Sequence, residues 1–154
     1  MNYLFAFILL FFNCKKDNTI QNENNVILNC LIFPTGVTTE TYFFKVFENG
    51  ELEVTFGEKD NNLENANFKN VIWQNKSIIT PNNLKLIKQY NIKLNSLRDL
   101  KRENLKKGGW EIILNSNNKR FNFYYGEQTK TAIGKIINEI IKSSPNKIDL
   151  HSWS

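Results

Sequence analysis

The chain has few of the residues from which metal sites and phosphate-binding loops are built. Its 154 residues include two cysteines, one histidine and seven glycines. One histidine and two distant cysteines cannot supply the ligands of a zinc site, and no acidic segment has the spacing of an EF-hand loop. The glycines do not form the pattern of a phosphate-binding loop. We therefore expect no metal and no cofactor.

A long apolar run is also missing. The run Leu4–Phe12 has nine residues, whereas a helix needs about 20 to cross a membrane. Nine residues is the length of the apolar segment of a secretory signal peptide. Asn13 and Cys14 follow this run, and then come Lys15, Lys16 and Asp17.

Residues 1–17 resemble a bacterial lipoprotein signal of the type found in Bacteroidota. The resemblance implies that residues 1–13 are a signal peptide and that Cys14 becomes the lipid-bearing N-terminal residue, with palmitate among its acyl chains. It also implies a lipid-anchored place in the cell envelope, on the inner or outer membrane and facing the periplasm or the surface. Residues 14–25 are then the lipidated cysteine and a polar, flexible tether.

The second cysteine leaves one alternative open. If Cys14 carries a lipid, Cys30 has no partner and packs as a small apolar residue in a strand. A disulfide between Cys14 and Cys30 in an oxidising compartment would exclude lipidation. We favour lipidation.

The net charge of +5 raises the question of nucleic-acid binding. Lysine supplies 17 of the 20 basic residues and asparagine occurs 25 times, an excess typical of an AT-rich genome. The densest basic cluster, Lys101–Lys107, contains Glu103 and no aromatic side chain on which bases could stack. We expect no nucleic-acid partner, and we interpret Lys106–Gly109 as the end of a helix.

Residues 26–154 are predicted to form a single domain. Its clearest β-hairpin consists of TYFFKVF and ELEVTF around residues 48–50. A two-residue turn would place Lys45 opposite Val54 on the apolar face. A three-residue loop with Gly50 in the left-handed conformation places Lys45 opposite Glu53 instead. Because a slip of one residue moves every side chain to the other face, we predict this loop, with one apolar face made of Tyr42, Phe44, Val46, Leu52, Val54 and Phe56.

A second hairpin pairs WEIIL with KRFNFYY about Asn117 and Asn118. One face then carries Trp110, Ile112, Leu114, Phe121, Phe123 and Tyr125. The segment Val26–Phe33 reads as a strand, Val71–Ile79 as an additional one, and the end of the chain near Trp153 as a terminal strand.

A helix is predicted after each hairpin. Thr80 and Pro81 are an N-cap and first helical residue, and isoleucines at helical spacing mark a helix from about Thr131 to Ser144. We expect an α+β fold in two layers, a mostly antiparallel sheet with two helices on one face. The predicted order of elements is ββα followed by ββα. This order is either an internal repeat or a coincidence, and the sequence leaves both interpretations open.

Catalytic residues are few. His151 lies near Asp149 and Ser152, but alternation along a strand places Ser152 on the opposite face, so a triad is not predicted. The carboxylates of Glu58, Glu111 and Glu127 could pair for glycoside hydrolysis, although the sequence does not show their separation. We therefore do not expect this protein to be an enzyme.

The sheet face away from the helices is the predicted interaction surface. Phe43, Phe47, Ile113 and Tyr124 point to it and form an exposed patch unless another segment covers them. We expect a non-catalytic binding domain with a protein or small-molecule ligand. One alternative is an immunity or inhibitor protein that neutralises a toxin or hydrolase at the envelope, and the other is a small envelope hydrolase.

Overall fold

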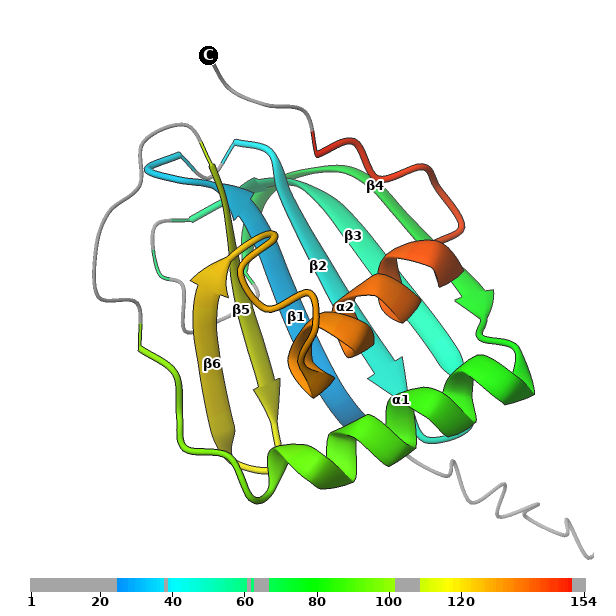
Figure 1. Ribbon diagram of the computed structural model, residues 1–154. Helices are drawn as coiled ribbons and strands as arrows, with labels where there is room; N and C mark the ends of the chain where they lie inside the picture. The colour runs from blue at the N-terminus through cyan, green and yellow to red at the C-terminus, as the bar shows by residue number, and fades with distance from the viewer. Residues whose placement is uncertain (1–24, 38, 61, 63–66, 102–108, 151–154) are drawn as a thin grey trace, which may run out of the picture.

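The computed structural model describes residues 25–37, 39–60, 62, 67–101 and 109–150. These residues form one open, six-stranded antiparallel sheet and two helices, an α+β fold (Figure 1). In chain order the elements are β1 (Val26–Pro34), β2 (Thr41–Phe47), β3 (Glu51–Lys59), β4 (Phe68–Ile78), α1 (Pro81–Leu94), β5 (Trp110–Ser116), β6 (Lys119–Tyr124) and α2 (Ala132–Ser143).

The strands lie in the order β4-β3-β2-β1-β5-β6. Four strands precede α1 and two separate it from α2, so the order is ββββα followed by ββα, and the repeated ββα layout is not confirmed. The central strand β1 pairs with β2 on one side and with β5 on the other, and so joins the two hairpins into one sheet.

The predicted register of the first hairpin is confirmed. Lys45 lies opposite Glu53, and Val46 lies opposite Leu52. Gly50 has a φ of 90°, and its N–H donates to the carbonyl oxygen of Phe47 at 3.0 Å, which closes the three-residue loop. A left-handed residue is needed at this position, and glycine adopts that conformation at little cost.

The second hairpin also has the predicted pairing. Ser116 lies opposite Lys119, and the two turn residues, Asn117 and Asn118, have φ of 51° and 60°. Two consecutive left-handed residues are the mark of a type I′ turn, in which asparagine is favoured. Tyr125 lies just beyond β6 and is exposed.

Both helices begin where the sequence predicts. The side chain of Thr80 accepts a hydrogen bond from the N–H of Asn83, and that of Thr131 accepts one from the N–H of Gly134. Each hydroxyl thereby satisfies one of the N–H groups that the first turn of a helix leaves without a backbone partner. None of the helices in the described part of the chain is long and apolar enough to cross a membrane.

The core lies between the helices and one face of the sheet. Figure 1 shows α1 and α2 in front of the sheet, with α1 across the end where β1 begins. Ile87 and Leu94 of α1 and Ile133, Ile136, Ile137 and Ile140 of α2 belong to one buried cluster with inward residues of the strands, among them Cys30, Phe44, Val54, Ile112 and Phe123.

Two expectations at other places need correction. Residues 148–150 form no strand, and Ile148 and Leu150 instead pack against the core as partly buried side chains. His151, Ser152 and Trp153 lie outside the described residues, as do Cys14 and the basic residues 102–107. The helix α1 ends at Leu94, and the segment after it is not helical as far as Lys101.

The packing of α2 gives a direct test. Ile137 is 2% exposed, so replacing it by alanine removes buried methyl groups and leaves a cavity. We expect Ile137→Ala to lower the free energy of unfolding by about 2–5 kcal/mol in urea denaturation. Ile92→Ala in α1 is the matched control, because Ile92 is 69% exposed and its loss should change stability by no more than about 0.5 kcal/mol. Equal effects of the two substitutions would contradict this core.

Candidate interaction surface

Two of the four residues predicted to form an exposed patch, Phe43 and Ile113, belong to a second, smaller core. Phe43, Ile113 and Tyr124 are buried, and Phe47 is partly buried. The prediction that these four side chains form an exposed apolar patch is therefore wrong. Leu31 of the central strand is paired with Phe43 on one side and with Ile113 on the other, so these side chains cover one another. We call the sheet face that bears this smaller cluster (Leu31, Phe33, Phe43, Ile113 and the adjoining Phe68) the second face.

Beside this cluster, charged residues of three strands form a ladder on the second face. Lys45 of β2 lies opposite Glu53 of β3, which in turn lies opposite Lys76 of β4. The Lys45 Nζ is 3.0 Å from Glu53 Oε1, and the Lys76 Nζ is 3.7 Å from Glu53 Oε2 and 2.7 Å from Glu51 Oε1. The sequence predicted the first of these pairs. It did not predict that Lys76 takes part in the ladder, because the sequence does not determine the register between β4 and β3.

An open depression of about 380 Å³ lies over this ladder and the adjoining apolar cluster. Phe43, Phe68 and Val71 supply apolar surface, and polar groups surround them. The full lining consists of Phe43, Lys45, Glu53, Thr55, Asn67, Phe68, Val71 and Gln74. These residues come from β2, β3 and β4 and from the residue just before β4, so only the folded sheet brings them together. A concave surface of mixed apolar and polar character suits the recognition of a side chain.

The depression borders one edge of the sheet. The two edges differ, because β6 is contacted on its outer side by the segment after α1: Leu100 forms a bridge with Phe121, and the N–H of Asn122 donates to the Leu100 carbonyl at 2.9 Å. Among the described residues, β4 pairs only with β3. β4 has 11 residues, with extra residues in its register at Ile72 and Lys69.

The stretch Trp73–Ile78 is the regular part of this edge. It pairs with Glu51–Phe56 without interruption. Bulges and lysines on an edge strand hinder unwanted pairing with other chains. The register shifts near Ile72 and Lys69 therefore leave Trp73–Ile78, next to the depression, as the stretch of β4 without a bulge. It carries one lysine, Lys76, whose Nζ is 2.7 Å from Oε1 of Glu51.

Two further depressions adjoin the second hairpin. One of about 300 Å³ is lined by Val26–Asn29 and residues 115–120, and one of about 330 Å³ by Asp99, Leu100, Lys101, Arg120 and Asn122. The Oδ1 atom of Asn122 is buried and has no hydrogen-bond partner among the described residues. A buried acceptor without a partner costs about 1–3 kcal/mol, so a donor from solvent would be favourable there. Both of these depressions lie at β6, the edge strand whose outer side is contacted by Leu100.

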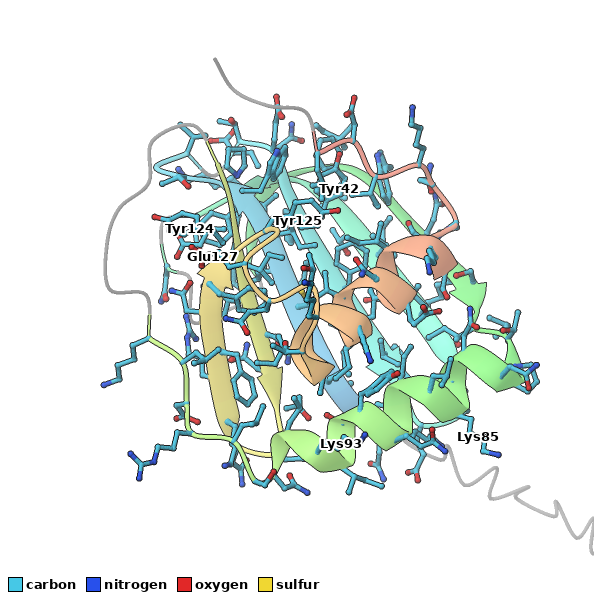
Figure 2. The ribbon with its side chains drawn as sticks, viewed as in Figure 1. Tyr42, Lys85, Lys93, Tyr124, Tyr125 and Glu127 are labelled. Atoms are coloured by element: carbon cyan, nitrogen blue, oxygen red, sulfur yellow. The ribbon has the colours of Figure 1, made fainter. Side chains whose placement is uncertain are left out.

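The three carboxylates considered for hydrolysis do not form one site. β3 and β6 are separated by β2, β1 and β5, so Glu58 lies roughly 19 Å from the strand that leads to Glu127, at about 4.8 Å per strand. Paired glycosidase carboxylates are about 5–9.5 Å apart. Glu127 accepts a hydrogen bond from the N–H of Tyr124 at 3.1 Å, beside which Figure 2 places it. Glu111 lies opposite Tyr124 in β5 and is buried.

The charge ladder predicts a pH dependence of stability. Burial raises the pKa of Glu53, but the hydrogen bond and charge of Lys45, the charge of Lys76 and a hydrogen bond from Gln74 outweigh burial and hold this pKa below its ordinary value. Such a group stabilises the fold above its unfolded pKa of about 4.3, and this contribution is lost as the pH falls through the folded pKa. We expect Glu53→Gln to cost about 1 kcal/mol at about pH 7 and less at about pH 3.

Urea denaturation of both proteins at the two pH values measures this difference. Glu58→Gln is the control, because the Glu58 side chain is 42% exposed and its Oε1 is 3.9 Å from the Nζ of Lys69. A cost of Glu53→Gln that stays the same at both pH values would show that the ion pairs are not its source.

Comparison with models of known protein families and with curated protein sequences finds no match to this chain. The candidate surface therefore rests on its own geometry: an open depression of mixed apolar and polar lining, a ladder of ion pairs, and the edge strand β4, which pairs only with β3 among the described residues.

Proposed function

We propose that this protein is a lipid-anchored protein of the cell envelope whose domain binds an extended segment of a partner protein without catalysis. The observation that carries the binding proposal is the position of the regular edge Trp73–Ile78 next to the open depression. The lipoprotein-like residues 1–17 support the anchor.

The environment of Cys30 supports lipidation of Cys14. Cys30 lies in the central strand β1, is fully buried and is a free cysteine. Burial raises the pKa of its thiol far above the ordinary value. Disulfide formation proceeds through a thiolate with access to its partner, and Cys30 has neither property. Cys14 thus remains available for an acyl chain.

Strand addition is the binding mode that this edge allows. An extended peptide can pair with the free N–H and C=O groups of an edge strand, and pockets for alternate side chains then supply specificity. Among the described residues, the helices contribute to the core on the other face of the sheet, so we take the second face and the β4 edge as the surface for a partner. Alternate side chains of a peptide paired with Trp73–Ile78 would point toward the second face, where Val71, Gln74 and the depression lie.

The anchor is tested by metabolic labelling with a fatty-acid probe. The wild type should be labelled and Cys14→Ser should not, because serine has no thiol to acylate. Cys30→Ala is the control, since its labelling should equal that of the wild type. Equal labelling of Cys14→Ser and wild type would refute the anchor, as would a mature N-terminus at another residue.

The binding surface is tested by photo-crosslinking in intact cells. A photoreactive amino acid replaces Val71, which is 48% exposed beside the depression, or Tyr125, which is 45% exposed beyond β6. We expect a discrete heterologous adduct from position 71 and none from position 125. Equal adducts at both positions, or none at position 71, would contradict the site. An adduct of twice the protein's own mass would mean that β4 pairs with a second copy instead.

A further inference from the structure

The helix α1 presents a basic surface at one end of the domain. Residues 81–94 include Lys85, Lys88 and Lys93 and no aspartate or glutamate. Figure 2 labels Lys85 and Lys93 on this helix, which lies across the end of the sheet. Ile87, Asn91 and Leu94 occupy the buried side. The adjoining segments carry three acidic residues: Glu48, whose carbonyl oxygen accepts a hydrogen bond from Lys88, Glu51, which lies opposite Ile78, and Asp99. Arg98 and Lys119 add positive charge there.

Exposed apolar side chains gather at the same end. On α1, Leu86 and Ile92 border the exposed arc on its two sides, with Lys85, Gln89 and Lys93 between them. Three more exposed apolar side chains lie in segments that adjoin this helix: Val26 at the start of β1, Ile78 at the end of β4 and Leu97 just after α1. Of the nine large apolar side chains exposed in the described residues, the remaining four lie elsewhere: Val37, Val71, Ile72 and Tyr125. A basic helix surface bordered by isolated apolar residues is typical of contact with anionic lipid headgroups.

The chain enters the domain beside this surface. The N–H of Glu48 donates to the carbonyl oxygen of Asn25 at 2.9 Å, and the carbonyl oxygen of Glu48 accepts a hydrogen bond from Lys88 Nζ at 3.0 Å. Asn25 and Lys88 of α1 are therefore both hydrogen-bonded to the same residue, Glu48. Asn25 is eleven positions after Cys14 in the sequence, which limits the distance between them to about 38 Å. A lipid on Cys14 would thus hold the α1 end of the domain close to the bilayer.

We propose that α1 lies against an anionic membrane surface, with Lys85 and Lys93 among the headgroups and Ile92 at the border of the apolar layer. The proposal rests on the lipid anchor and adds to it a fixed orientation of the domain. Electrostatic attraction acts only within about a Debye length of the surface, roughly 8–10 Å. The tether allows α1 to reach this range, and the charge of the helix would then favour its contact with the surface.

The test uses the full lipidated protein in vesicles of phosphatidylcholine alone or of an equal mixture of phosphatidylcholine and phosphatidylglycerol. An environment-sensitive fluorophore is attached to Ile92→Cys or to Val37→Cys. Val37 is exposed in the loop after β1, at the other end of that strand. The fully buried Cys30 and the acylated Cys14 do not react with the label.

In the anionic vesicles we expect headgroup-region quenchers to reduce the fluorescence at position 92 several-fold more than at position 37. Lys85→Glu with Lys93→Glu should remove this difference while the protein still co-sediments with the vesicles. Equal quenching at the two positions, or equal effects in both kinds of vesicle, overturns the orientation while the anchor stands. Loss of co-sedimentation of the unsubstituted protein overturns the anchor, and the orientation with it.

Discussion

The fold depends on the burial of β1 on both faces of the sheet. Leu28, Cys30 and Ile32 contribute to the core beneath the helices, whereas Leu31 and Phe33 contribute to the second face. The same strand provides the backbone partners of β2 and of β5. Without β1 the sheet would separate into the three strands β2, β3 and β4 on one side and the hairpin of β5 and β6 on the other. The hairpin would be marginal by itself, because a stable sheet needs at least three strands or a packed helix.

The hairpins and helices could be predicted because local rules determine them. Gly50 and the pair Asn117 and Asn118 set the turns, and the opposed charges of Lys45 and Glu53 select one register. Alternation also assigned Phe43 and Ile113 to the correct face. It did not show that Leu31 lies between them, because the lateral order of strands is a long-range property.

The candidate surface was harder to predict for the same reason. Thr55, Phe68 and Gln74 meet at the depression only after β4 has paired with β3. Two register shifts in that pairing move the side chains of β4 relative to simple alternation. Gly57 permits this, since a Cβ there would be 2.1 Å from the carbonyl oxygen of Asn70. No pattern in the sequence of residues 67–78 alone predicts this close approach of β4 to Gly57 of β3.

The two proposed contacts fit one orientation of the domain. β4 runs from Phe68, at the end of the sheet far from α1, to Ile78, which leads through Thr80 into α1. If α1 lies on the membrane, β4 points toward the bilayer, and the depression at Phe68 and Val71 lies on the side away from it. A segment paired with Trp73–Ile78 would then run along the membrane normal over roughly 20 Å, at 3.3 Å for each of six residues. The two surfaces meet at Ile78, which ends β4 and adjoins α1. A lipid anchor near α1 and a binding edge that extends from Ile78 away from the lipid are therefore compatible.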